Sequence, residues 1–206
     1  MNITDQYPCQ YDLLPYSGIN PGYRTEILDR ITERLVESLQ LHSQVLTVPL
    51  VIRFPTAIIS YPDNNCFQYF IEEYRRCLRD HGFDPHYVWV TEKSQSLNQH
   101  YHLILMLNGN KIRYFSTPPI EALHLWGKAL QRHYGYNGSP EGLIHVCCTD
   151  NQSVFPEYGC LIHRGDMEAL QRIQTIYSYY AKVNTKGFTE NRVREFGASL
   201  LKGRRA

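Results

Sequence analysis

The stretch HYVWVTEKSQSLNQHYHLILML, residues 86–107, decides the fold. It contains two runs rich in β-branched, aromatic and aliphatic residues, 86–92 and 100–107, separated by the polar segment KSQSLNQ. Two such runs joined by a short polar loop predict a β-hairpin. We therefore expect an antiparallel sheet with this hairpin at its centre.

The sequence on either side of the hairpin predicts further helices and strands. Apolar residues recur at helical spacing in four segments, and other runs have the composition of strands. The expected helices cover 22–42, 63–80, 119–133 and 166–183, and the expected strands cover 45–54 and 142–148. Pro49 suggests a sheet edge or a bulge, and residues 57–61 extend the first strand after a kink at Pro55. The expected fold class is α+β, a central antiparallel sheet flanked by helices.

Length and composition favour one globular domain. The chain has 206 residues, of which 43% are hydrophobic and 20% charged, as is typical of such domains. We expect an irregular N-terminal arm over 1–21, a single domain over 22–199 and a basic tail over 200–206. Neither a signal peptide nor a membrane span is visible, which indicates a cytoplasmic protein.

Charge and cysteine content bear on whether the protein binds nucleic acid, holds a zinc ribbon or has a redox motif. The net charge is +1, but residues 182–206 carry +5 and the rest of the chain −4. This basic end either contacts phosphates or is a solvated tail. The six cysteines include no C-x-x-C pair, so neither a zinc ribbon nor a redox motif is indicated. In a reducing cytoplasm these cysteines are expected to be buried small apolar residues.

The hairpin carries a candidate metal site. Alternation along a strand sends His100 and His102 to the same face. Glu92, which ends the preceding run, shares its face with Val88 and Val90, so a short hairpin brings it beside the two histidines. Two imidazoles and a carboxylate can bind one divalent ion and leave coordination positions open. The alternative is that these are hydrogen-bonded polar residues without a metal.

A candidate nucleophile lies in the last predicted helix, within the segment SYYAK, residues 178–182. Tyr179 and Lys182 are three residues apart and therefore share a helix face, with Lys186 on the same side. Tyr180 belongs to the apolar stripe and is expected in the core. A nearby lysine can stabilise the phenolate of an attacking tyrosine. The alternative is an amphipathic helix with aromatic packing and a solvated lysine.

The combination of these motifs resembles a known family. WVTEKSQSLNQHYHLILMLNGN (89–110), SYYAKVNTK (178–186) and REFGAS (194–199) are similar to motifs in the replication initiators of filamentous phages (inoviruses, gene-II type). They are most similar to those of the YagK/YfjJ-type prophage proteins. The resemblance covers about residues 45–199. It implies the fold of the HUH endonucleases, in which metal-binding histidines lie on a central antiparallel sheet.

The resemblance also implies roles for individual residues. His100 and His102 match the metal-binding histidines, Glu92 the third ligand, Tyr179 the nucleophile and Lys182 the motif lysine. Tyr180 stands where the family usually has a non-aromatic residue, so it is the alternative nucleophile. The implied cofactor is Mg²⁺ or Mn²⁺, and histidine ligands favour Mn²⁺.

The activity implied is site-specific nicking of single-stranded DNA through a 5′-phosphotyrosine intermediate, which initiates rolling-circle replication of a phage or prophage element. The expected partners are a single-stranded DNA origin and, beyond it, the host helicase and polymerase. Contacts to DNA are expected from Lys186, Arg192 and Arg194. The rival hypotheses are a non-catalytic DNA-binding regulator, an HUH transposase or relaxase, and a structural protein with incidental histidines.

Overall fold

The computed structural model describes residues 3–4, 12–13, 22–61, 63–93, 98–114, 116–147, 160–183 and 193–200. All four predicted helices and both hairpin strands are present. In chain order the elements are β1 (Ile3–Thr4), β2 (Tyr23–Arg24), α1 (Thr25–Leu41), β3 (Gln44–Arg53), α2 (Asn65–Asp80), β4 (His86–Glu92), β5 (His100–Asn108), α3 (Thr117–Tyr134), β6 (Ile144–Val146), β7 (Cys160–His163), α4 (Met167–Ser178), a 3₁₀ turn (Tyr179–Ala181) and β8 (Phe196–Ala198).

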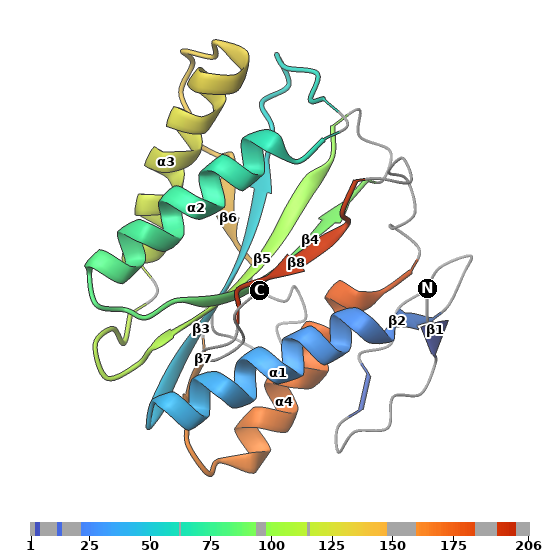
Figure 1. Cartoon of the computed structure of the whole chain (residues 1–206), viewed down its shortest axis with the longest axis vertical. Coiled ribbons are helices and arrows are strands. Elements are labelled where there is room, and N and C mark those ends of the chain that lie inside the picture. Colours follow the sequence, from blue (N-terminus) through green and yellow to red (C-terminus); the bar gives the residue numbers. More distant parts are fainter. Residues whose placement is uncertain are drawn as a thin grey trace.

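Within the part of the chain that the structure describes, six strands form one sheet with helices on both faces. The strand order is β6–β3–β5–β4–β8, with β7 also paired to β3, and each of these pairs is antiparallel. Helices α2 and α3 cover one face, and α1 and α4 cover the other (Figure 1). The predicted fold class, α+β with an antiparallel sheet flanked by helices, is confirmed.

The two faces of the hairpin belong to different cores. Leu103 and Leu105 of β5 pack with the residues of α2 and α3, whereas Ile104 and Met106 pack with those of α1 and α4. By the same alternation, His100 and His102 lie on the α1/α4 face. On that face, the first part of β5 therefore carries two histidines, and the later part carries apolar side chains.

Pro49 does not mark an edge or a bulge, because β3 is an interior strand. Its neighbours are β5 on one side and the short strands β6 and β7 on the other. The carbonyl of Pro49 accepts a hydrogen bond from the backbone N–H of Cys147, so its nitrogen also points toward the β6/β7 side. Pro49 lies between the residues that β6 and β7 pair with, and the proline therefore breaks no bond to β5.

Two other predicted segments differ from the structure. Residues 57–61 do not extend β3: they form no strand, and the side chain of Asn98 holds them by hydrogen bonds to Ile58 and Ser60. The last helix was predicted to reach 183, but α4 ends at Ser178 and a 3₁₀ turn follows. The backbone of Lys182 then forms a β-bridge with Tyr23, which takes the chain out of helical conformation.

The short strands β1, β2, β7 and β8 were not predicted, and β8 contains three residues of the REFGAS motif, FGA. This strand pairs with β4 and closes that side of the sheet. Arg24 donates a 2.6 Å hydrogen bond to the carboxylate of Glu195, and the Arg34 Nε donates a 2.6 Å bond to the carbonyl of Ser199. Gly197 lies so close to Trp89 that an added Cβ would be 2.6 Å from the indole Nε1. The motif therefore fixes an edge strand beside the hairpin.

Candidate metal centre

Glu92, His100 and His102 meet on the α1/α4 face of the sheet. In the β4–β5 register Glu92 lies directly opposite His100, and Val90 lies opposite His102. The Glu92 Oε2 is 3.8 Å from the His100 Nε2 and 3.3 Å from the His102 Nε2. The three residues each offer a ligand atom, and these atoms lie within 4.8 Å of one another. The group can hold a metal ion, as the strand alternation predicted.

The surroundings keep His100 in the form that a metal needs. Glu92 is 3% exposed, and both histidine side chains are largely buried. Burial, followed by the neighbouring His102, lowers the pKa of His100 to about 4. Its imidazole is therefore neutral near pH 7 and has a lone pair available.

Lys182 contacts both the cluster and a tyrosine. Its Nζ lies 3.3 Å from the Glu92 Oε2 and 3.6 Å from the centre of the Tyr179 ring. Lys182 is only 5% exposed. The two residues meet as predicted, but not as neighbours on a helix face, since α4 ends at Ser178. The ammonium contacts the face of the Tyr179 ring, a cation–π arrangement.

The two adjacent tyrosines have different environments. Tyr179 is 37% exposed, whereas Tyr180 is 7% exposed and packs its ring 4.9 Å from that of His102. Burial is the main cause that raises the pKa of Tyr180 well above its usual value. Tyr177 also stacks on Tyr180. The predicted burial of Tyr180 is therefore confirmed.

The predicted DNA-binding residues are only partly within the described chain. Arg194 is exposed, and its carbonyl accepts a hydrogen bond from the side chain of Asn64. Lys186, Arg192 and the tail beyond Leu200 lie outside the described residues.

Sequence reasoning missed Arg53, an exposed cation beside the cluster. Arg53 ends β3 directly opposite His100, so both side chains leave the same face of the sheet. It is close enough to contribute to the lowered pKa of His100. Alternation along β3 could have assigned Arg53 to one face of the sheet. Its position opposite His100 could not be predicted, because β3 and β5 are distant in the sequence.

One histidine outside the hairpin is less exposed than its place in the sequence indicates. His42 ends the helix predicted over 22–42, a position that predicts a side chain facing solvent, but its Nε2 lies 3.0 Å from the Asp84 Oδ2 and its side chain is mostly buried. Asp84 has a positive φ of 45°, which turns the chain between α2 and β4.

The fold and the cluster together define a class: an α+β domain with two histidines and a glutamate gathered on a sheet face, next to a lysine and a tyrosine from the C-terminal helical segment. Residues 10–199 match the model of the YagK/YfjJ C-terminal domain, and the chain belongs to this family. No curated protein and no solved structure matches the chain. None of the described helices is long and apolar enough to cross a membrane.

Proposed function

We propose that this protein is a metal-dependent nickase of single-stranded DNA that initiates rolling-circle replication of a prophage element. One observation carries the proposal: Lys182 contacts both the Glu92 carboxylate and the Tyr179 ring. A candidate metal cluster and an accessible phenol therefore lie next to each other, on either side of Lys182. The HUH endonucleases combine these parts, and the proposal assigns this chain to their class.

The residues present fit a divalent ion. Two imidazoles and one carboxylate form a mixed nitrogen and oxygen donor set, which Mn²⁺ accepts more readily than Mg²⁺ does. Three protein ligands leave positions for a substrate oxygen. A bound ion would neutralise charge on the scissile phosphate and orient it.

The proposed reaction is a transesterification by Tyr179. Its Oη forms a bond to phosphorus, the bond between phosphorus and the 3′ oxygen breaks, and the DNA 5′ end stays on the tyrosine. The phenol loses one proton and the released 3′ oxygen gains one, so the step is balanced. Glu92, His100 and His102 would hold the ion. Lys182, which contacts the Tyr179 ring, would support the developing phenolate.

Tyr179 is favoured over Tyr180 because it is accessible, and because burial disfavours ionisation of the Tyr180 phenol. Tyr179 presents more than a third of its surface to solvent, and Tyr180 is enclosed. The raised pKa of Tyr180 disfavours its phenolate, the form that attacks phosphorus. Tyr180 therefore has the role of supporting the His102 ring by packing.

The surface beside the cluster is suited to a single strand. The exposed Arg53 offers a cation to the backbone next to His100, and the exposed Tyr179 ring can stack on a base. Lys186, Arg192 and Arg194 are proposed to extend this contact. A host helicase and polymerase would act on the opened strand and on its 3′-hydroxyl.

The test is a search for the covalent intermediate. The full chain is incubated with a labelled pool of single-stranded DNA of random sequence and Mn²⁺, and a denaturing gel detects labelled protein. We expect an adduct that is lost with EDTA and with Glu92→Gln. If no adduct forms with Mn²⁺ or Mg²⁺ while the DNA is still bound, the nickase proposal is overturned in favour of the DNA-binding regulator. An adduct that joins a second DNA strand efficiently would indicate the transposase or relaxase class.

A further inference from the structure

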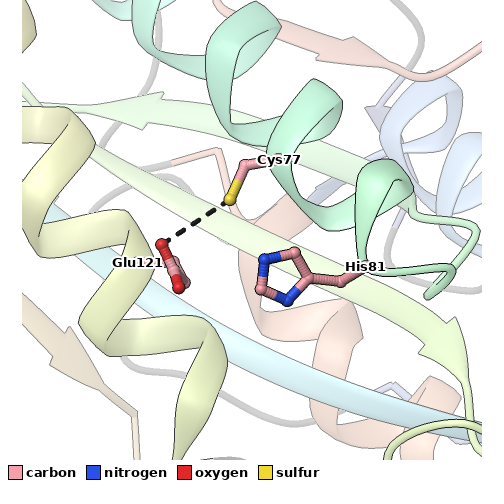
Figure 2. A group of neighbouring side chains, drawn as sticks. All are labelled: Cys77, His81 and Glu121. Atoms are coloured by element: carbon pink, nitrogen blue, oxygen red, sulfur yellow. Dashed lines mark hydrogen bonds between the residues drawn. The ribbon is translucent and has the colours of Figure 1, made fainter.

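A second group of metal-ligand side chains lies on the outer side of the α2/α3 helix pair. Cys77 and His81 come from the C-terminal end of α2, and Glu121 comes from α3 (Figure 2). One atom from each lies within 4.8 Å of the others. Figure 2 shows the three side chains gathered in the space between the two helices.

Local structure brings these residues together. Cys77 and His81 are four residues apart, which places them one above the other on the same side of a helix. Near Glu121, the buried Tyr74 hydroxyl donates a 2.7 Å hydrogen bond to the carbonyl of Pro118. This bond ties α2 to the first turn of α3, so the backbones that carry the three ligands are held in register.

The spacing of the donor atoms suits a tetrahedral ion. The Cys77 Sγ and the Glu121 Oε2 are 3.6 Å apart. Bond lengths of about 2.3 Å to sulfur and about 2.0 Å to oxygen at a tetrahedral angle separate the two donors by about 3.5 Å. His81 is exposed at the helix end, so its ring can rotate toward the same point without disturbing the core.

The donor set selects the metal. A thiolate, an imidazole and a carboxylate suit Zn²⁺ and related transition-metal ions, whereas a soft thiolate ligand is a poor match for Mg²⁺ and Mn²⁺. The Glu92 cluster contains no sulfur and lies on the α1/α4 face, across the sheet from this group. The two groups therefore differ in position and in the ion that they favour.

We propose that Cys77, His81 and Glu121 form a zinc site that links α2 to α3, with water as the fourth ligand. In the metal-free protein the Cys77 thiol donates a hydrogen bond to the Glu121 carboxylate. On binding, sulfur and oxygen each bond to the ion, and the thiol proton passes to solvent. The site stabilises the helix pair and is independent of DNA nicking.

Co²⁺ tests the proposal, because a cobalt–thiolate bond gives a near-ultraviolet charge-transfer band that nitrogen and oxygen ligands do not. We expect metal-free full-length protein to develop this band with Co²⁺ and to lose it when Zn²⁺ is added. Cys77→Ser should abolish the band. Cys160→Ser, a change at another half-buried thiol, should keep it.

His81→Ala and Glu121→Gln should weaken Co²⁺ binding at this site by about tenfold or more. His163→Ala, at an exposed histidine of β7, should not. Because His81 lies at the surface of a helix end, its removal tests the site even where Cys77→Ser fails to fold. Absence of the band in the wild type, or its survival in Cys77→Ser, overturns the proposal. An unchanged Co²⁺ affinity in His81→Ala overturns the three-ligand assignment.

Discussion

The Nζ of Lys182 and the Oε2 of Glu92 lie 3.3 Å apart, and both side chains are almost completely buried. The same oxygen faces the Nε2 atoms of His100 and His102. A divalent ion held by these three residues would bring a second cation next to the ammonium. Lys182 and the ion are therefore alternative partners for one buried carboxylate.

Replacing Lys182 by Met should show whether the lysine and a metal ion compete for the Glu92 carboxylate. The change keeps the length of the side chain but leaves Glu92 without its ammonium, which should destabilise the metal-free protein by about 3–5 kcal/mol. Mn²⁺ should stabilise the variant more than the wild type, since it supplies the missing charge. Urea unfolding with and without Mn²⁺ measures both effects.

Lys128→Met is the matched control, because Lys128 is exposed on α3 and should change the free energy of unfolding by no more than about 0.5 kcal/mol. A loss of stability at Lys182 that Mn²⁺ does not reverse would show that the lysine and the ion do not share Glu92.

Removing one histidine should show whether Mn²⁺ binds at the Glu92 cluster. His102→Ala should weaken Mn²⁺ binding by at least about tenfold, as expected when a metal ligand is removed. His145→Ala provides the control: Val51 pairs with both His102 and His145, but His145 is exposed and outside the cluster. Electron paramagnetic resonance of free Mn²⁺ gives both affinities. Equal affinities for the two variants would place the ion elsewhere.

The cluster could be predicted because the pattern that defines it lies within one short stretch of sequence. Alternation alone assigns His100 and His102 to one face, and a short hairpin fixes the register that brings Glu92 opposite His100. The helices were found for the same reason, since their apolar spacing is read within one segment. Tyr180 was assigned to the core because it belongs to the apolar stripe, and Tyr179 was placed on the face of Lys182 because it lies off that stripe.

The parts that were missed depend on contacts between distant segments. Arg53 reaches the site through the β3–β5 register, and β8 is a three-residue strand that exists because β4 offers an open edge. The end of α4 has no local breaker: Lys182 leaves the helical path where it pairs with Tyr23. The spacing of Cys77 and His81 is visible in the sequence, but Glu121 joins them only when α2 and α3 pack.

Gly197→Ala should test the fit of β8 against β4. The new methyl group would lie 2.6 Å from the Trp89 Nε1, and Trp89 is itself buried. Either the indole or the strand must move, which should destabilise the protein by about 1–3 kcal/mol. Thermal unfolding measures this destabilisation. Gly127→Ala in α3 is the control. Its new Cβ would contact only the side chain of Pro140, at 3.3 Å, and alanine is more favourable than glycine inside a helix by about 0.8 kcal/mol. A Gly197 variant as stable as the wild type would mean that β8 is loosely held.

Deleting residues 200–206 should weaken DNA binding without affecting chemistry. The segment contains Lys202, Arg204 and Arg205. Each cation that no longer neutralises a phosphate should lower the slope of log affinity against log salt by about 0.7 for a single strand. Fluorescence anisotropy across a salt series measures this slope. A full-length variant with the three cations changed to Gln should behave like the deletion, and an unchanged slope in both would exclude the tail from the DNA interface.

The adjacent tyrosines allow a direct test of the nucleophile. Tyr179→Phe removes the proposed attacking oxygen from an exposed ring and should abolish the covalent DNA adduct, while DNA binding and stability stay at wild-type levels. Tyr180→Phe keeps the ring that packs on His102 and removes one buried hydroxyl, which should cost less than about 1.5 kcal/mol. This variant should still form the adduct with Mn²⁺. The two substitutions are chemically identical and one residue apart, so each serves as the control for the other. If Tyr180→Phe loses the adduct and Tyr179→Phe retains it, the buried tyrosine is the nucleophile, and the segment that covers it must open before DNA can reach the cluster.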